Sequence, residues 1–257
     1  MITAGIDMGA KYVKVVILQD GTVKGKAIVL MGFDPLEAAS ACMKEAAEKA
    51  GIDPGTIDHI TATGAGRKAA PNANSDITDV GAAAKGMVHV KEGVHTVIDV
   101  GAEEGRAIKI DAEGKVIDFA VNEKCAAGAG AFAESMSRAL EVSLEEFGKL
   151  SLQSDKSIPM NAQCAVFAES EVVSLVHAKT PKRDISRAVH DAIASRIVSM
   201  VRRVGINNDI ALIGGVSHNP GFVDAIQRSL ETDLIVPEEP DYVSALGAAI
   251  VAGERNK

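Results

Sequence analysis

Aromatic side chains are scarce in this chain, where six Phe and two Tyr make up 3% of the 257 residues and Trp is absent. A stacking platform for bases and an aromatic cage for a cation both need several such side chains, so neither kind of site is expected. Basic residues are outnumbered, with 27 Lys and Arg against 35 Asp and Glu and a net charge of −8. This balance argues against nucleic acid or an anionic membrane as a partner.

Long apolar runs are also missing, and none approaches the roughly 18 residues that a membrane-spanning helix needs. The start of the chain, Met1 to Asp7, has neither the basic segment nor the apolar core of a signal peptide, so we expect a cytoplasmic protein. Three cysteines, Cys42, Cys125 and Cys164, are too few and too far apart for a disulfide framework. Free thiols or metal ligands are the better interpretation.

The apolar content is nevertheless high enough for a compact fold. Hydrophobic residues make up 47% of the chain and charged residues 24%, and the mean hydropathy is +0.12. A chain of 257 residues exceeds the usual domain of about 100–200 residues, which favours two halves.

Apolar periodicity and turn residues predict the same order of elements twice along the chain. Each half opens with three strands, and the pair Asp20-Gly21 is typical of a tight hairpin turn. The predicted strands are Thr3–Met8, Tyr12–Leu18, Thr22–Leu30, Ile57–Thr63, His95–Val100, Arg106–Ile110, Lys115–Val121, Asp209–Ile213 and Leu234–Val236. The predicted helices are Leu36–Ala50, Asp76–Met87, Ala129–Leu140, Ser143–Lys149, Ala165–His177, Ile185–Arg203, Gly221–Leu230 and Tyr242–Glu254. Mixed sheets with helices on their faces place the chain in the α/β class.

An Asp-x-Gly sequence closes the first strand of each half, as Asp7-Met8-Gly9 and as Asp99-Val100-Gly101. At such a position the carboxylate can hold hydrated Mg²⁺, and the glycine lets backbone N–H groups approach a phosphate. A third glycine break, Gly214-Gly215, follows a predicted strand, where ligands commonly bind in α/β sheets. Two facing Asp-x-Gly loops would clamp a nucleoside triphosphate. Three ordinary turns remain the alternative.

The sequence contains neither a P-loop nor a dinucleotide-binding glycine motif, because Gly64-Ala65-Gly66 lacks the third glycine. Glu103 and Glu104 follow the second Asp-x-Gly and could orient a water at a γ-phosphate, although adjacent acids at a turn are often simply solvated.

Cys125 and Cys164 each stand just before a predicted helix and close to small residues. The N-terminus of a helix lowers the pKa of a thiol and stabilises an anionic metal–sulfur cluster. A [4Fe-4S] cluster needs four thiolates, so two cysteines from each of two subunits would satisfy the count. Two small buried cysteines are the alternative. Cys42 falls in the middle of a predicted helix and is expected in the core.

Taken together, these motifs resemble the BadF/BadG/BcrA/BcrD-type ATPase family, which contains activators of 2-hydroxyacyl-CoA dehydratases and the ATP-hydrolysing subunits of benzoyl-CoA reductase. The matching segments include Gly5-Ile-Asp-Met-Gly9, Ala62-Thr-Gly-Ala-Gly-Arg67, Thr96-Val-Ile-Asp-Val-Gly101, Asn122-Glu-Lys-Cys-Ala-Ala-Gly128, Cys164-Ala-Val-Phe-Ala-Glu-Ser-Glu-Val172, Gly214-Gly-Val216 and Ala245-Leu-Gly-Ala-Ala249. The cysteine motifs are specific for that family, whereas the phosphate motifs are shared with the acetate and sugar kinase, heat-shock protein and actin superfamily.

The resemblance implies an actin-like fold of two duplicated subdomains with mixed sheets flanked by helices. One subdomain would comprise residues 1–92 and the C-terminal helix 242–257, and the other residues 93–241. It further implies ATP or ADP with Mg²⁺, and one [4Fe-4S] cluster shared between two subunits through Cys125 and Cys164. The catalytic residues would be Asp7, Asp99 and Glu103. The cofactor-binding residues would be Gly9, Ala10, Lys11, Lys14, Gly101, Glu134, Gly214, Gly215, His218 and Asp241.

The implied activity is ATP hydrolysis coupled to the transfer of single low-potential electrons into a partner enzyme. Reduced ferredoxin or flavodoxin would be the donor, and the second subunit would be an identical chain or a paralogous ATPase subunit. The acceptor would be an acyl-CoA reductase or dehydratase component, and no acyl-CoA pocket is expected in this chain.

Two departures from the activators bear on the choice of partner. In the first loop the activators usually have Gly-Ser-Thr, where this chain has Gly9-Ala10-Lys11. In the second loop they usually have Gly-Gly-Gln-Asp, where this chain has Gly101-Ala102-Glu103-Glu104. The second run is more similar to the smaller ATPase subunit of benzoyl-CoA reductase, so we favour a benzoyl-CoA reductase subunit over a dehydratase activator. A small-molecule kinase with core cysteines and a nucleotide-dependent assembly protein without catalytic activity are the further alternatives.

Overall fold

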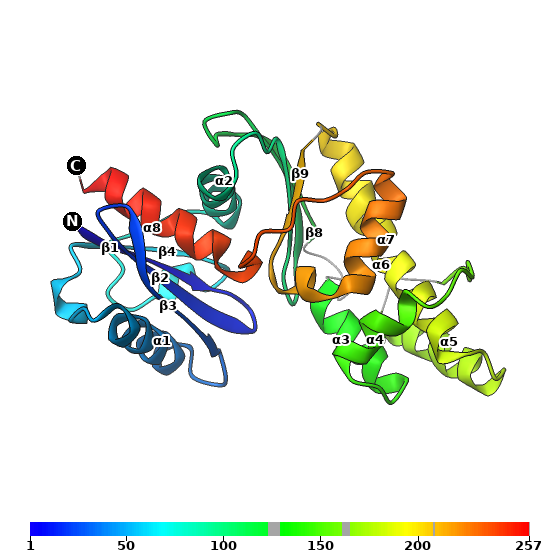
Figure 1. The fold of residues 1–257 in the computed structure, drawn as a ribbon. Helices are drawn as coiled ribbons and strands as arrows, with labels where there is room; N and C mark the ends of the chain where they lie inside the picture. The colour runs from blue at the N-terminus through cyan, green and yellow to red at the C-terminus, as the bar shows by residue number, and fades with distance from the viewer. Residues whose placement is uncertain (123–128, 161–164, 208, 257) are drawn as a thin grey trace. The chain divides into compact units, whose positions relative to one another are not determined.

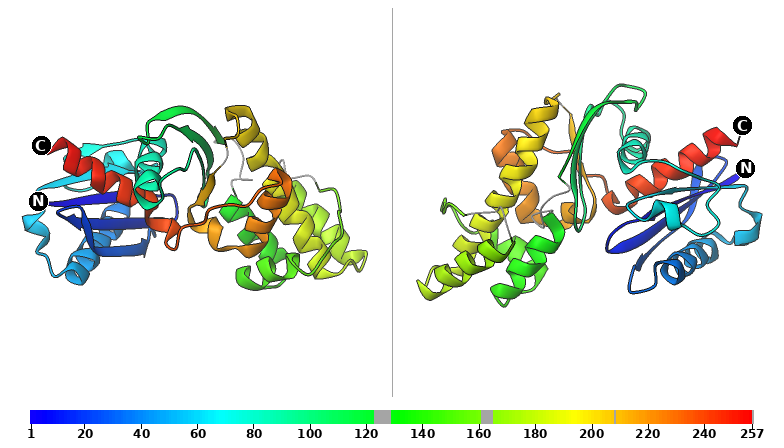
Figure 2. Two further views of the ribbon diagram at one scale, coloured as in Figure 1. Left: turned by 45° about the horizontal axis from the view of Figure 1, so that its top comes forward. Right: turned by 180° about the vertical axis from the view of Figure 1, so that it is seen from behind.

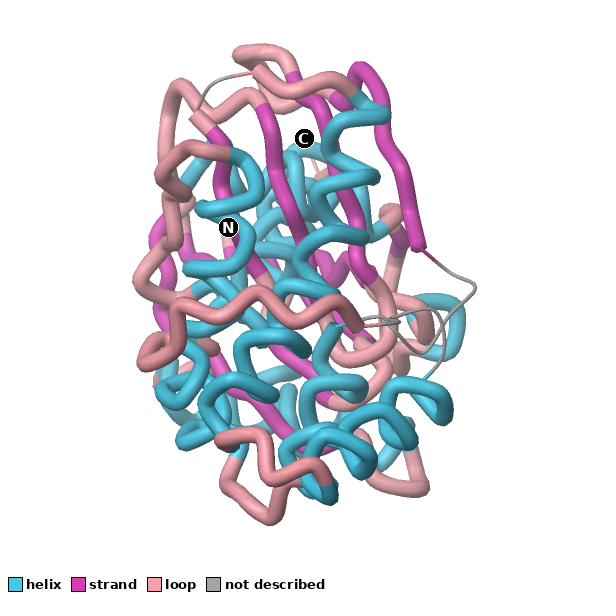
Figure 3. Tube along the Cα trace, turned by 90° about the vertical axis from the view of Figure 1, so that its right-hand side faces the viewer, coloured by secondary structure: helices cyan, strands magenta, loops and turns pink. Residues whose placement is uncertain are grey.

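The computed structural model describes residues 1–122, 129–160, 165–207 and 209–256. The chain forms two compact units. Unit 1 comprises Met1–Val97, Ile110–Asp118 and Pro237–Lys257, and unit 2 comprises Ile98–Lys109 and Phe119–Val236. Figure 1 follows the elements in chain order, and Figure 3 colours them by type.

Unit 1 contains a five-stranded sheet in the order β3-β2-β1-β4-β5. Strands β1 (Ile2–Met8), β2 (Tyr12–Gln19) and β3 (Thr22–Leu30) are antiparallel, whereas β4 (His59–Thr63) and β5 (Ser75–Asp76) run parallel to β1. Asp20 and Gly21 both have positive φ, 52° and 78°, as a type I′ hairpin turn requires. The three predicted strands at the start of the chain are therefore confirmed.

Helices cover both faces of this sheet, as the two views of Figure 2 show. Helix α1 (Pro35–Ala50) packs on β2 and β3, with its N-terminus capped by Asp34 and its C-terminus ended by Gly51 at φ 66°. The other face carries α8 (Val243–Arg255), which also packs against α2 (Asp79–Val90). The β1 positions that face α1 contribute Ala4, Ile6 and Met8 to an apolar core, and those facing α8 include Thr3 and Gly5.

Glycine allows α8 to lie directly on β1. A Cβ built on Gly5 would overlap the carbonyl oxygen of Ala245, and the Thr3 hydroxyl donates to the carbonyl oxygen of Ala249 at 3.1 Å. From Thr3 to Gly5 the strand advances by about 6.6 Å, and the contact on the helix moves back from Ala249 to Ala245, which is about 6 Å along the helix axis. The strand therefore runs toward the N-terminal turn of α8, and its last polar residue, Asp7, lies toward that end of the helix.

The second sheet lies mainly in unit 2, and its order β8-β7-β6-β9 repeats the order β3-β2-β1-β4 of the first. Its strands are β6 (Thr96–Val100), β7 (Gly105–Ile110), β8 (Val116–Asn122) and β9 (Ile210–Ile213). The internal duplication expected from element order is confirmed by this matching topology. The predicted strand Leu234–Val236 is wrong, because only Ile235 pairs, through an isolated bridge to Ala211.

Five helices of unit 2 enclose an apolar core that contains Phe132, Phe147 and Phe222. They are α3 (Ala129–Ala139), α4 (Leu144–Ser151), α5 (Ala165–His177), α6 (Lys182–Val204) and α7 (Pro220–Leu230). The predicted helices are thus found, with shifted ends. Helix α2 begins at Asp79 rather than Asp76, because Thr78 caps it by accepting from the Gly81 N–H.

His190 joins three of these helices inside the core. Its Nδ1 donates to the Ser186 carbonyl oxygen of α6 at 2.7 Å, and its ring packs against Phe147 of α4. Its Nε2 lies 3.2 Å from Oδ1 of Asn219, which caps α7. Burial lowers the pKa of His190, because desolvation disfavours the charged ring. In the described part of the chain, no helix is long and apolar enough to cross a membrane.

Candidate nucleotide site

The first Asp-x-Gly loop lies at the end of β1 in unit 1. Asp7 is 7% exposed, and its Oδ2 accepts from Lys14 Nζ at 3.0 Å across the β1–β2 pair. The N–H of Gly9 donates to the Tyr12 carbonyl oxygen at 3.1 Å and closes the turn. A Cβ on Gly9 would stand 2.9 Å from that oxygen and 3.3 Å from Lys14 Nζ. The turn therefore requires glycine, and it sets an ammonium group beside the loop.

The second loop repeats this arrangement in unit 2. Asp99 is also 7% exposed, and Arg106 donates to its Oδ2 at 3.1 Å. The N–H of Gly101 donates to the Glu104 carbonyl oxygen at 2.9 Å. In both halves the cation therefore comes seven residues after the acid, on the next strand.

A glycine with positive φ packs against each acid from the end of a neighbouring strand. Gly64 follows β4 at φ 91°, and a Cβ there would stand 2.6 Å from Asp7 Oδ1 and 2.5 Å from the Met8 carbonyl oxygen. Gly214 follows β9 at φ 87°, and a Cβ there would stand 2.9 Å from Asp99 Oδ1 and would also overlap the Val100 carbonyl oxygen. Each carboxylate is thus held between a cation and a glycine loop.

The remaining expected residues lie on the two loops, on the turn after Gly214 and on the turn before α8. Ala10 is exposed, and Lys11 Nζ lies over the Tyr12 ring at 5.6 Å. Glu103 is exposed on the second loop, and Gly215 and His218 are exposed on the 3₁₀ turn after Gly214. Asp241 lies in the turn before α8, in unit 1.

Helix α3 connects Glu134 with the second loop. The N–H groups of Gly130 and Ala131 donate to the carbonyl oxygens of Gly101 and Ala102, at 3.2 and 2.8 Å. A Cβ on Gly130 would stand 2.9 Å from the Ala102 Cα, so this contact depends on glycine. Glu134 follows one turn later on the same helix and is half-buried.

Sequence reasoning assigned no site role to three residues: Arg106, Gly64 and Thr63, which pairs with Asp7 in the sheet. Arg106 could have been found from its spacing, because it follows Asp99 as Lys14 follows Asp7. Gly64 and Thr63 depend on the parallel pairing of β4 with β1, and no local pattern reveals that register.

The expected cluster ligands, Cys125 and Cys164, lie outside the described residues. Among the residues that are described, no group of three acidic, Cys or His side chains could hold a metal ion. Cys42 is buried as expected, with Sγ 3.4 Å from the carbonyl oxygens of Val13 and Ala27. Burial raises the pKa of its thiol to about 12, so this cysteine is a poor source of thiolate.

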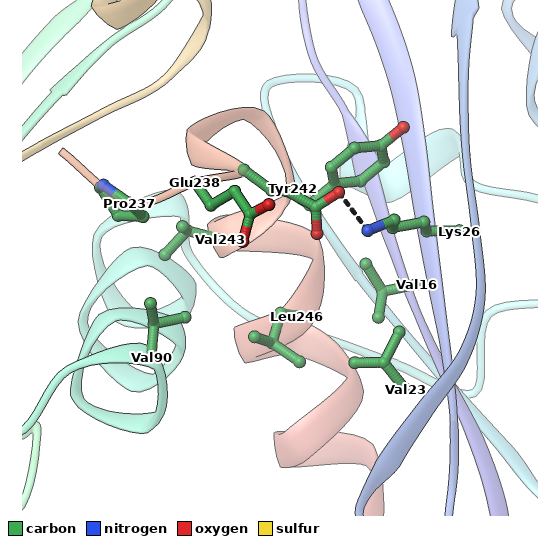
Figure 4. Close-up of a pocket in the computed structure, with 10 residues that line it drawn as sticks. Val16, Val23, Lys26, Val90, Pro237, Glu238, Tyr242, Val243 and Leu246 are labelled. Carbon is green, nitrogen blue, oxygen red and sulfur yellow. Dashed lines mark hydrogen bonds and ion pairs between the residues drawn. The ribbon is translucent and has the colours of Figure 1, made fainter.

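A pocket of about 210 Å³ lies elsewhere in unit 1 and is mainly apolar (Figure 4). An ion pair between Lys26 and Glu239 lies at its edge, and Lys26 Nζ is 5.5 Å from the centre of the Tyr242 ring. The pocket contains neither Asp-x-Gly loop. Its lining includes Val16, Val23, Val90, Pro237, Val243 and Leu246.

Comparison with known proteins identifies the family. The family described as "BadF/BadG/BcrA/BcrD ATPase family" matches residues 4–252. The chain belongs to this family. It is therefore an ATPase-family protein with an actin-like fold, as expected.

The relatives separate the two branches of the family that sequence reasoning considered. The chain is 37% identical over 254 residues to the activator of lactoyl-CoA dehydratase from Anaerotignum propionicum, covering 99% of this chain and 98% of the relative. It is 29% identical over 267 residues to a benzoyl-CoA reductase subunit from Thauera aromatica, covering 100% and 94%. The preference for a benzoyl-CoA reductase subunit is therefore less well supported than its alternative, a dehydratase activator.

Solved structures agree with the dehydratase branch. Component A of (R)-2-hydroxyglutaryl-CoA dehydratase from Acidaminococcus fermentans has a TM-score of 0.95 at 33% identity, covering 100% of this chain and 99% of that chain. The 2-hydroxyisocaproyl-CoA dehydratase activator from Clostridium difficile, solved with bound ADPNP, has a TM-score of 0.93 at 32% identity, covering 100% and 96%. A glucokinase from Streptomyces griseus, at 16% identity and a TM-score of 0.62, shares the fold alone.

The close contact at Gly64 leads to a stability prediction. Alanine at Gly64 should reduce the free energy of unfolding by about 1–2 kcal/mol for the left-handed backbone, plus a further loss from the overlap with Met8 and Asp7. Gly93→Ala is the matched control, since Gly93 has φ 84° and no atom within 4 Å of a built Cβ. Urea unfolding of both variants measures the difference. Equal losses in the two variants would contradict the close packing of the loop on Asp7.

Proposed function

We propose that this protein is the ATP-hydrolysing activator of a 2-hydroxyacyl-CoA dehydratase and delivers single low-potential electrons to the dehydratase component. Similarity to activators over nearly the whole chain is the observation that carries the proposal. The pair of matched acid–glycine loops supports nucleotide binding, because each combines a fixed carboxylate with accessible backbone.

The loops fit a magnesium–nucleotide complex. At Gly101 the nearest atom to a built Cβ is the Glu104 carbonyl oxygen at 3.7 Å, so the missing side chain leaves room for a phosphate near the backbone. Lys14 and Arg106 offset the charges of Asp7 and Asp99, which would otherwise repel a polyphosphate. Mg²⁺, when bound, supplies positive charge that compensates the phosphate oxygens.

In this proposal, each Asp-x-Gly loop takes part in binding the nucleotide. Asp7 and Asp99 position the cation and the attacking water, and Glu103 assists at the second loop. The groups contacting the phosphates are Gly9, Ala10, Lys11, Lys14 and Gly101, and those on the adenosine side are Gly214, Gly215 and His218. Glu134 and Asp241 add further contacts. The absence of Ser or Thr hydroxyls at Ala10 and Lys11 leaves backbone N–H groups and lysine charge as the donors of the first loop.

Helix α3 offers a physical link from the nucleotide to the electron carrier. It is hydrogen-bonded to the second loop through Gly130 and Ala131. Cys125 precedes the first residue of this helix by four positions in the sequence. It also packs against α5, which begins directly after Cys164. We propose that these two cysteines, from each of two subunits, hold a [4Fe-4S] cluster, and that changes at the second loop reach it along α3.

Coupling to ATP is needed because the electron moves uphill. Raising one electron by roughly 300 mV costs about 7 kcal/mol, which thermal motion does not supply steadily. In each step the protein is oxidised by one electron and its partner is reduced by one. A soluble one-electron donor, reduced ferredoxin or flavodoxin, then restores the reduced protein.

The activity is tested by mixing the reduced protein with the 2-hydroxyacyl-CoA dehydratase component of the same organism, without oxygen. We expect one electron to appear on the dehydratase component with Mg²⁺ and ATP, and none with a non-hydrolysable analogue. Optical and electron paramagnetic resonance spectra follow the transfer. ATP-dependent transfer to a benzoyl-CoA reductase core, and not to the dehydratase component, would replace this proposal with the reductase alternative.

The cluster assignment is tested by iron content. Cys125→Ser and Cys164→Ser should each lose nearly all iron after purification without oxygen, because each substitution removes two of four ligands in a homodimer or one in a heterodimer. Cys42→Ala should keep its iron, since that thiol is buried in unit 1. Full iron in Cys125→Ser, or equal loss in Cys42→Ala, would overturn the assignment.

A further inference from the structure

The hydroxyl of Thr63 is buried without a hydrogen-bond partner among the described residues. Thr63 is 0% exposed, and its Oγ1 is one of few buried side-chain atoms in this condition. Thr61, two residues earlier on β4, is also 0% exposed, but its hydroxyl lies 2.9 Å from Ser75 Oγ. A buried hydroxyl without a partner destabilises a fold, so a reason for keeping it is needed.

The location of Thr63 points to the first Asp-x-Gly loop. Thr63 pairs with Asp7 in the parallel β1–β4 register. Residues opposite each other on neighbouring strands place their side chains on the same face of a sheet. Gly64, the next residue, packs against Asp7 Oδ1. The hydroxyl of Thr63 and the carboxylate of Asp7 therefore lie on one face, at the ends of adjacent strands.

This is the face that α8 covers, and its N-terminal turn lies toward these strand ends. Successive β1 positions on this face, Thr3 and Gly5, contact α8 at Ala249 and then at Ala245. Asp7 and Thr63 follow in the same direction, toward the first turn of the helix. The partial positive charge of a helix N-terminus favours anionic groups there. A carboxylate beside an alcohol suits the water ligands of a hydrated cation, and the positive helix end suits the polyphosphate that carries this cation.

The second half of the molecule supplies an internal comparison. Gly214 corresponds to Gly64, because each has φ near 90° and packs on the carbonyl oxygen of the residue that follows the Asp of its loop. The residue before Gly214 is Ile213, which is 1% exposed and apolar. The fold therefore accepts an apolar side chain at this position, and the hydroxyl of Thr63 is not needed for the backbone arrangement.

We infer that Thr63 is a positioning residue of the nucleotide site, and that its hydroxyl hydrogen-bonds a water molecule of the divalent cation held at Asp7. This inference rests on the proposed function, since it requires Mg²⁺ and a nucleotide at the first loop. It makes the two loops unequal, because the Asp99 loop has Ile213 in the place of this hydroxyl.

The test uses three variants of the full chain. Thr63→Val removes the hydroxyl and keeps the shape, Thr63→Ser keeps a hydroxyl, and Thr61→Val removes a hydroxyl that has a partner. For each variant, the unfolding midpoint is measured without ligand, and its shift is measured with Mg²⁺ and AMPPNP. The Mg²⁺ concentration that gives half-maximal ATP hydrolysis is the second readout.

We expect Thr63→Val to unfold without ligand at or above the wild-type midpoint, and to need about tenfold more Mg²⁺, the effect of one lost hydrogen bond. Thr63→Ser should stay within about twofold of the wild-type Mg²⁺ requirement. Thr61→Val should show the opposite pattern, with a lower midpoint and an unchanged Mg²⁺ requirement.

An unchanged Mg²⁺ requirement in Thr63→Val would overturn the inference while leaving the proposed function in place. A drop in the unliganded midpoint of Thr63→Val as large as that of Thr61→Val would also overturn it, because the hydroxyl would then be structural. If the wild-type protein shows neither a midpoint shift nor ATP hydrolysis, the proposed function itself fails, and the inference fails with it.

Discussion

The candidate site depends on how closely two loops approach the ends of neighbouring strands. Gly64 and Gly214, with φ of 91° and 87°, let the loops after β4 and β9 lie directly on the strand ends at Asp7 and Asp99. Any Cβ at these positions would meet a backbone carbonyl oxygen, and a backbone cannot move aside as a flexible side chain can. The close packing of each loop on its acid therefore depends on glycine.

Charge is arranged in the same way in both halves. Asp7 and Lys14 face each other across an antiparallel pair, and Asp99 and Arg106 are joined in the corresponding place. Each pair is largely buried, so each carboxylate has one fixed orientation and a nearby positive charge. A polyphosphate can approach such a loop without meeting an uncompensated anion. In unit 2, helix α3 is in addition hydrogen-bonded to the second loop through the N–H groups of Gly130 and Ala131.

Local patterns are enough to predict most of the fold. Strand alternation, the Asp20-Gly21 turn and the glycine after Ala50 define the elements of unit 1, and the repeated Asp-x-Gly reveals the duplication. Local patterns do not show which residues face each other across parallel strands, so they do not place Thr63 and Gly64 beside Asp7. The strand expected at Leu234–Val236 is wrong because its apolar residues make only one bridge. The run that follows Asp99 favours the reductase branch, but similarity over the whole chain favours the activators.

The central claim is that both Asp-x-Gly loops are needed to bind nucleotide, and calorimetric titration with AMPPNP and Mg²⁺ tests it most directly. The wild-type protein should bind one nucleotide per chain. Asp7→Asn and Asp99→Asn should each weaken binding at least tenfold, equivalent to about 1.4 kcal/mol, while Asp20→Asn, at an exposed hairpin turn, should not. Two nucleotides bound per chain, or full affinity in either loop variant, would contradict the account.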